Sequence, residues 1–208
     1  MGFLKKFTKQ EISWMMYDWA NSAHSVIVVT ILPIFFDSVA SCTADSVSSM
    51  STWGYATSIA MAIVALAAPF LGVFGDIRGM RKKLFAAFLL LGVVSVTGLA
   101  FTPLMDFTSS TAAASKVAML VLVLYILSTI GFDASCIYYD AFLTDVTTED
   151  RMDSVSTLGY GLGYIGGSTI PLLIFLIMNA VGVPMLTSLA IIFAITAVWW
   201  LVFSLPLR

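Results

Sequence analysis

Three aspartates lie inside long apolar stretches of the sequence. Asp18 falls in the first stretch, and Asp133 and Asp140 fall in the fourth. An ionised, unpaired carboxylate in a lipid bilayer costs several kcal/mol, so acids in such positions usually face the interior of a helix bundle or a water-filled path. We therefore treat these three residues as candidates for contact with a polar solute or an ion.

Each acid belongs to a polar stripe at helical spacing. Asp133 and Asp140 are seven residues apart and share one face of a helix. The stripe on the first stretch consists of Trp14, Asp18, Asn21, Ser22 and Ser25. Two polar stripes on otherwise apolar helices indicate an aqueous cavity between them. The alternative is that the acids only hydrogen-bond neighbouring hydroxyl groups and hold the helices together.

The composition places these stripes in a membrane. The chain has 208 residues, of which 60% are hydrophobic and 11% charged, and a mean hydropathy of +0.99. A soluble domain of this length would need far more polar surface. Six segments reach the length of about 20 residues that a spanning helix needs. We expect one all-α transmembrane domain over residues 1–208, with spans at about 13–36, 53–75, 84–103, 117–146, 155–178 and 184–205.

The basic residues predict the orientation of this domain. With six spans, Lys116 stands alone on one side, and the other side receives Lys5, Lys6, Lys9, Arg78, Arg81, Lys82, Lys83, Arg151 and Arg208. Cytoplasmic loops are enriched in Lys and Arg, so we expect both termini in the cytoplasm of a bacterial-type cell, with the chain in its cell membrane. The basic residues form no stripe suited to phosphates, which argues against a nucleic-acid partner.

His24 is the only histidine, and it limits the chemistry further. It lies about 120° around its helix from Asp18, off the polar stripe. We interpret it as a hydrogen-bonded structural residue, with a proton relay as the alternative. One histidine and no clustered cysteines give no basis for a metal site or a catalytic triad. We therefore expect no enzyme, no metal and no cofactor.

The fifth span contains a glycine-rich segment. Gly161, Gly163 and Gly166 fit a dinucleotide-binding spacing, but no strand precedes them, which argues against nucleotide binding. Gly159 and Gly163 are four residues apart, a spacing that lets helices approach closely in lipid. We expect helix packing at Gly159, Gly163, Gly166 and Gly167.

Several motifs resemble one transporter family. Between the second and third spans, Gly72, Asp76, Gly79 and Arg81 resemble the signature loop of the major facilitator superfamily. Residues 17–23 (Tyr-Asp-Trp-Ala-Asn-Ser-Ala) and the glycine-rich residues 156–167 are similar to the first and fifth helices of its branch related to the vacuolar amino-acid effluxers of autophagy. Residues 139–143 also fit that branch, although similar members often have Asn in place of Asp140.

The resemblance implies a fold and a function. A twelve-helix transporter of this superfamily has two six-helix halves with the solute cavity between them, and this chain resembles the amino-terminal half. Helices one and four would line the cavity, and Asp76 and Arg81 would act in a cytoplasmic gate. A second half, from a separate chain or a second copy, would complete the cavity.

From the stripes and the resemblance together, we expect a secondary active transporter, or half of one, working by alternating access. Its partners would be membrane lipid and a small polar solute such as an amino acid, and one of its acids could couple transport to protons. The pathway residues would be Asp18, Asn21, Ser22, Ser25, Asp133 and Asp140. The alternative is a non-transporting six-helix membrane subunit that assembles with a partner chain.

Overall fold

The computed structural model describes residues 6–43 and 46–207, and these residues contain helices and no strands. The main helices are α1 (Lys9–Thr30), α2 (Leu32–Ala40), α3 (Ser46–Asp76), α4 (Met80–Phe101), α5 (Thr111–Val146), α6 (Glu149–Leu162), α7 (Thr169–Ala180) and α8 (Met185–Ser204). Three short helical turns accompany them: η2 (Thr102–Leu104), η3 (Gly163–Ser168) and η4 (Leu205–Leu207). Lys5 and Arg208, which we counted in the orientation, lie outside the described residues.

Six helical stretches are long and apolar enough to cross a membrane. They run over Lys9–Ala40, Ser48–Asp76, Met80–Leu104, Thr111–Val146, Glu149–Ala180 and Met185–Leu207. The first combines α1 and α2, and the fifth combines α6, η3 and α7. The prediction of an all-helical fold with six membrane-length helices is confirmed.

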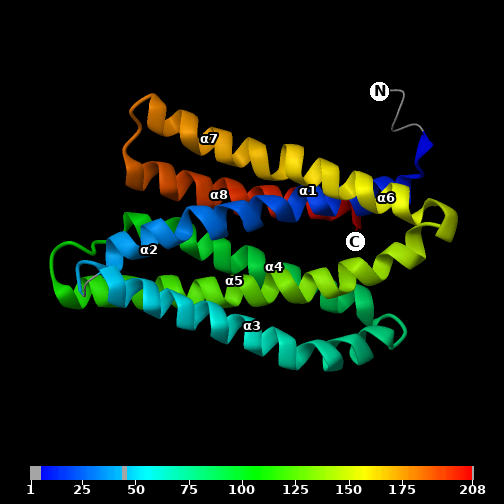
Figure 1. The fold of residues 1–208 in the computed structure, drawn as a ribbon, viewed down its shortest axis with the longest axis horizontal. Coiled ribbons are helices and arrows are strands. Elements are labelled where there is room, and N and C mark those ends of the chain that lie inside the picture. Colours follow the sequence, from blue (N-terminus) through cyan, green and yellow to red (C-terminus); the bar gives the residue numbers. More distant parts are fainter. Residues whose placement is uncertain (1–5, 44–45, 208) are drawn as a thin grey trace.

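The helices form one elongated bundle (Figure 1). The start of α1 and the end of α8 lie at the same end of it as the α3–α4 and α5–α6 turns. The most extensive packing joins α4 to α5, and α8 packs against both α1 and α4. The turns around which the basic residues cluster in the sequence therefore share one end of the molecule.

The first and fifth spans are each divided into shorter helical segments. At Ile31, between α1 and α2, the backbone stays helical, because Ile31 N donates to Ile27 O (3.0 Å) and Phe35 N donates to Ile31 O (3.1 Å). In the fifth span, η3 is a π-helical turn of six residues. The Thr169 hydroxyl donates to the Tyr164 carbonyl at 3.0 Å. Such local hydroxyl bonds satisfy carbonyl groups in lipid that an irregular helix leaves free.

The core contains both close backbone contacts and large buried aromatic side chains. A Cβ atom added to Gly131 on α5 would lie 2.5 Å from the Gly92 nitrogen on α4, so these two helices touch with no side chain between them. The ring of Trp200 on α8 covers Gly92 and is itself fully buried. The helices α4, α5 and α8 are thus in close contact in this part of the core.

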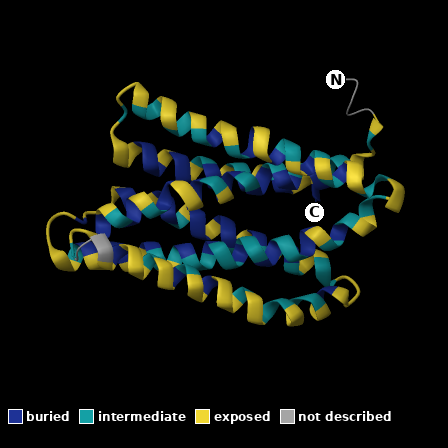
Figure 2. Cartoon of the chain, in the orientation of Figure 1, coloured by how far each residue is buried: buried dark blue, intermediate teal, exposed yellow. Residues whose placement is uncertain are grey.

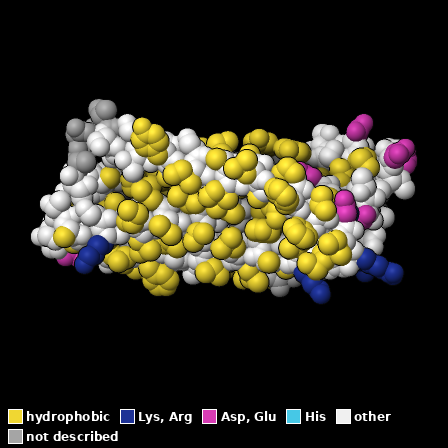
Figure 3. All heavy atoms as spheres, turned by 90° about the horizontal axis from the view of Figure 1, so that it is seen from below, with side chains coloured by type: hydrophobic (Ala, Val, Ile, Leu, Met, Phe, Trp, Pro, Cys, Tyr) yellow, Lys and Arg dark blue, Asp and Glu magenta, His cyan; other side chains and the backbone are white. Residues whose placement is uncertain are grey.

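The outer faces of the bundle carry large apolar side chains that are exposed. On α3, Leu66 and Phe70 are 76% and 67% exposed, and Figure 2 shows further exposed positions along most of this helix. Seen from that side, apolar side chains cover the length of the molecule and the charges lie toward its two ends (Figure 3). Such a surface is suited to lipid or to another membrane protein.

Candidate functional site

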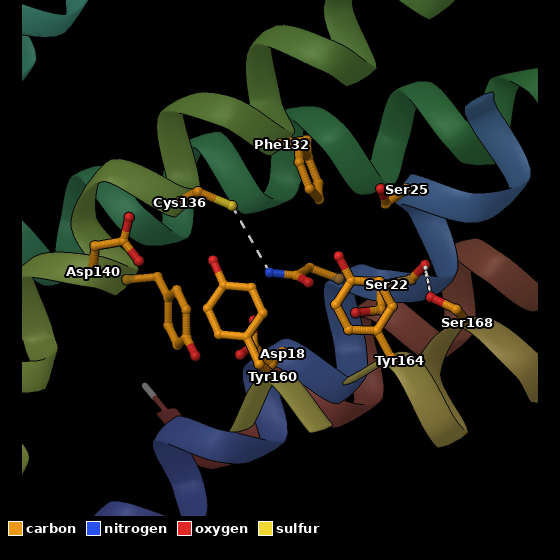
Figure 4. A pocket seen from close by; sticks show the side chains of 11 residues that line it. Asp18, Ser22, Ser25, Phe132, Cys136, Asp140, Tyr160, Tyr164 and Ser168 are labelled. Carbon is orange, nitrogen blue, oxygen red and sulfur yellow. Dashed lines mark hydrogen bonds between the residues drawn. The ribbon is translucent and has the colours of Figure 1, made fainter. Parts of the chain in front are cut away.

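A polar pocket of about 250 Å³ opens between the first, fourth and fifth spans (Figure 4). The helices that enclose it are α1, α5, α6 and η3. Its lining residues are Asp18, Asn21, Ser22, Ser25, Phe132, Cys136, Tyr139, Asp140, Tyr160, Tyr164 and Ser168. The structure thus brings Asp18, Asn21, Ser22 and Ser25 of the first stripe together with Asp140 of the second, whereas Trp14 and Asp133 do not line the cavity.

The α1 wall contains the whole stripe from Asp18 to Ser25. Positions 18, 21, 22 and 25 are three and four residues apart, so a regular helix directs all of them to one side. The Asn21 amide donates to the Cys136 thiol, with 3.8 Å between Nδ2 and Sγ. This hydrogen bond joins the two polar walls across the pocket (Figure 4).

Only one of the two acids on the fourth span belongs to the α5 wall of the pocket. Asp140 is exposed and lines the pocket, whereas Asp133 is half-buried and does not. The lining on α5 begins at Phe132, and Asp133 lies on the same helix face as Asp140 but about two turns before it. Of the six predicted pathway residues, five lie together and Asp133 lies apart.

Buried aromatic contacts fix α1 against α5 beside the pocket. The Trp14 indole N–H donates to the Tyr139 carbonyl at 2.9 Å, and the two rings stack at 4.3 Å. One helical turn away, the Tyr17 and Ser135 hydroxyls are 2.7 Å apart. Indole and phenol groups that find partners in this way set the spacing of the pocket walls.

One carboxylate oxygen in the pocket makes no hydrogen bond of standard geometry. Asp18 is 8% exposed, and its Oδ2 atom has no hydrogen bond of standard geometry within residues 6–43 and 46–207. The Tyr139 hydroxyl, which interacts with the Asp18 side chain, also lacks a partner of standard geometry in the same part of the chain. A buried carboxylate normally finds donors, so this site has unused hydrogen-bonding capacity.

The glycine-rich segment packs directly on α1. A Cβ at Gly163 would lie 2.7 Å from the Ser22 hydroxyl, and a Cβ at Gly159 would lie 3.1 Å from Asp18 Oδ2. At Gly166 and Gly167 a Cβ would overlap the ring and the carbonyl oxygen of Trp19. Because no side chain separates the helices, Tyr160, Tyr164 and Ser168 reach the pocket from the neighbouring positions.

The loop that resembles a gate centres on Arg81. Its Nη1 atom is 2.7 Å from Asp145 Oδ2 and donates to the Ala141 carbonyl at 3.2 Å, while Nη2 is 3.6 Å from Asp76 Oδ1. Gly79, the residue directly before α4, has a φ of +80°, a conformation that favours glycine. Gly72 lies inside α3, with open space where its side chain would be. Arg81 therefore links the second and third spans to the end of the fourth.

Residues 7–208 match the protein family described as "Vacuole effluxer Atg22 like". The chain belongs to this family. It is also similar to the uncharacterized MFS-type transporter YxiO of Bacillus subtilis (strain 168), with 42% identity over 212 residues that include 98% of this chain. The chain spans 47% of the length of that relative. No solved structure matches the chain.

The resemblance to the major facilitator superfamily is thereby confirmed for this Atg22-like chain, and membership of a transporter family indicates a role in transport. Among the described residues, no group of three or more His, Cys, Asp or Glu could hold a metal ion. The polar pocket is thus the candidate site of this Atg22-like protein.

Sequence reasoning missed Glu11 in this Atg22-like chain. Glu11 is 1% exposed, although it lies one turn before the polar stripe. Its carboxylate accepts hydrogen bonds from Arg151, from the Thr147 hydroxyl at 2.7 Å and from the Thr8 backbone at 2.7 Å. The available signal was the Thr8-x-x-Glu11 spacing, which is typical of a capping box at the start of a helix. No such signal marks its partners Thr147 and Arg151, which follow Glu11 by 136 and 140 residues.

The interpretation of His24 needs one correction. His24 is buried and its ring stacks on Phe132 at 4.8 Å and tilts against Trp200, also at 4.8 Å. Neither ring nitrogen has a hydrogen-bond partner in the described part of the chain. The predicted hydrogen-bonded histidine is therefore a packed aromatic residue in this structure, because its neighbours on α5 and α8 are aromatic rings.

Proposed function

We propose that this chain forms the amino-terminal six-helix half of a secondary active transporter that moves a small polar solute, such as an amino acid, by alternating access. The observation that carries the proposal is the pocket that Asp18 on α1 and Asp140 on α5 both line. Acids inside apolar spans are costly and are retained mainly for function. The family match supports transport as the general role.

The pocket would be one wall of a larger cavity. It is smaller than most sites for complete small molecules, which measure roughly 300–1,000 Å³. A second six-helix half, in a longer chain, a separate chain or a second copy, would supply the opposite wall. The relative YxiO, of which this chain spans 47%, is long enough to contain both halves.

We place the end of the bundle that carries the α3–α4 and α5–α6 turns in the cytoplasm of a bacterial-type cell, because the basic residues gather there. Arg81, held by Asp145 and Asp76, would close this side of the cavity. One of the pocket acids would couple solute movement to protons.

The test combines native mass with flux. We expect the purified chain in nanodiscs to form a dimer or to require a second six-helix partner, and liposomes with the completed assembly to take up labelled amino acids. Asp18→Asn and Asp140→Asn should each reduce uptake and its dependence on pH. Asp106→Asn, in the exposed loop before α5, is the matched control. Uptake that is equal in all four proteins would refute the assigned pathway.

The alternative is a six-helix subunit that binds a partner chain without transport, for which the exposed apolar side chains of α3 would provide a surface. Water in the pocket distinguishes the two functions. A Ser25→Cys variant should react with a small hydrophilic thiol reagent if the pocket is an aqueous path. Ala23→Cys, at a fully buried position on the same helix, should remain unreactive. No reaction at position 25 within the assembled protein would favour the subunit.

A further inference from the structure

The charge of the pocket has one sign only. Its eleven lining residues include the carboxylates of Asp18 and Asp140 and no Lys or Arg. The other lining groups are hydroxyl, amide, thiol and aromatic side chains. Opposite charges attract more strongly away from bulk water, and like charges repel more strongly there. A pocket of this kind therefore favours a cation over an anion of the same size.

Asp18 adds a specific requirement for a donor. Asp18 is 8% exposed and lines the pocket, and its Oδ2 atom has no hydrogen bond of standard geometry in the described residues. The Tyr139 hydroxyl, which interacts with this side chain, is a neutral donor and leaves the negative charge without a cation. An ionised carboxylate has only acceptor sites, whereas an ammonium group has three N–H donors and no acceptor. An ammonium group in the pocket would therefore complete the hydrogen bonding of Asp18.

Aromatic rings supply a second feature that suits a cation. Phe132, Tyr139, Tyr160 and Tyr164 all line the pocket, and the rings of Tyr160 and Tyr164 stack at 6.5 Å (Figure 4). The face of an aromatic ring attracts an ammonium or guanidinium group. Tyr160 and Tyr164 are exposed, so their rings are free to contact a solute.

From these three features we infer that the pocket binds the ammonium end of an organic cation, and that the protein selects solutes of net positive charge over zwitterions and anions. The inference rests on the proposed function and narrows its substrate class. Asp18 and Asp140 bind the charged group, and Tyr160 and Tyr164 pack against the adjoining carbon chain. The second half of the cavity surrounds the rest of the solute.

The test measures binding of four probes to the full chain in nanodiscs, with its partner half where one is required. Putrescine and arginine represent cations, leucine a zwitterion and glutamate an anion. We expect putrescine and arginine to bind at least ten times more tightly than leucine, and glutamate to bind most weakly. Binding of the cations should weaken as salt is raised.

Variants connect this preference to the pocket. Asp18→Asn and Asp140→Asn should each weaken putrescine binding at least ten-fold, and Tyr160→Leu should weaken it about five-fold. Asp106→Asn and Tyr55→Leu, at exposed positions outside the pocket, are the matched controls. If Asp18→Asn does not fold, the exposed Asp140 still provides the measurement.

The outcomes separate the inference from the proposed function. Equal or tighter binding of leucine or glutamate, or cation binding that is indifferent to both Asn variants, would overturn the inference. Uptake of leucine that depends on Asp18, with no binding of putrescine or arginine, would overturn it and leave the transport function standing. Neither binding nor uptake of any of the four probes would refute both.

Discussion

Arg151 holds the buried carboxylate of Glu11 through two parallel hydrogen bonds, Nε to Oε1 and Nη2 to Oε2, each 2.8 Å long. The two residues are 140 positions apart in the sequence. The pair ties the first turn of α1 to the first turn of α6, and Arg151 also donates to the Lys6 carbonyl at 2.9 Å. The guanidinium therefore fixes the start of the pocket-lining helix.

Removing this guanidinium should destabilise the protein. Arg151→Met leaves Glu11 buried with the Thr147 and Thr8 donors only, and an uncompensated buried charge is costly. The Arg151 side chain is 39% exposed, so we expect the free energy of unfolding to fall, but by less than it would on breaking a fully buried pair. Thermal unfolding in detergent measures this loss.

The double variant Glu11→Gln/Arg151→Met is the control, and it should be more stable than Arg151→Met alone because no charge remains buried. Arg78→Met, in the exposed α3–α4 turn, reports the effect of losing a surface arginine. Equal melting temperatures for Arg151→Met and Arg78→Met would contradict the stabilising role of the pair.

The two acids around Arg81 should differ in their contribution to stability. The Asp145 contact is 2.7 Å long and the Asp76 contact is 3.6 Å, and the Asp76 side chain is 83% exposed. We expect Asp145→Asn to lower the free energy of unfolding by about 0.5–1 kcal/mol, and Asp76→Asn to leave it unchanged. Chemical denaturation of both variants in the same detergent compares them. A larger loss for Asp76→Asn would show that Arg81 prefers the other acid.

Adding one methyl group at Gly167 should disturb the contact between η3 and α1. The new Cβ would overlap the Trp19 carbonyl oxygen, which also accepts the Trp199 indole N–H at 3.0 Å and is therefore fixed. We expect Gly167→Ala to cost about 1–3 kcal/mol. Gly161→Ala, where no atom lies within 4 Å, should be neutral or stabilising. If both variants melt at the same temperature, the close approach at Gly167 is not required.

His24 should tolerate an apolar replacement. The imidazole makes ring contacts with Phe132 and Trp200 and has no hydrogen-bond partner among the described residues. Replacing an unsatisfied buried polar group by an apolar one of similar shape is nearly neutral or stabilising. We expect His24→Phe to retain both stability and solute uptake. Loss of pH-dependent uptake with unchanged stability would instead identify His24 as a proton relay.

Thiol labelling can determine the orientation of the bundle. In a Cys136→Ala background, the exposed Cys42, beyond the end of α2, should react with a membrane-impermeant maleimide on intact cells. A cysteine at Arg78, at the opposite end of the bundle, should react only in inverted vesicles. The reversed pattern would place the termini outside the cytoplasm.

The sequence was most informative where the helices are regular. The α1 stripe could be read directly, because 3.6 residues per turn hold from Lys9 to Thr30 and project Asp18, Asn21, Ser22 and Ser25 to one side. The six membrane-length helices followed from hydropathy because lipid requires each span to satisfy its own backbone. Both inferences depend on local properties of the chain.

Features that depend on distant contacts or irregular turns could not be predicted. The π-helical turn at η3 changes the direction of side chains within a span, so a regular helical wheel does not place Tyr164 or Ser168 correctly. Asp133 shares a helix face with Asp140, yet only the packing of α1 and α6 decides which part of that face becomes the pocket. The burial of Glu11 depends on Arg151, which no local pattern connects to it.

The long separation between Glu11 and its partners also constrains how the protein is made. When the first span leaves the ribosome, Thr147 and Arg151 have not yet been synthesised, because they follow Glu11 by 136 and 140 residues. Until the fourth span has been made, the first turn of α1 therefore lacks the hydrogen bonds from Thr147 and Arg151 to Glu11. These hydrogen bonds to Glu11 can form only after Arg151 has been synthesised, so the pocket takes its final form late in membrane insertion.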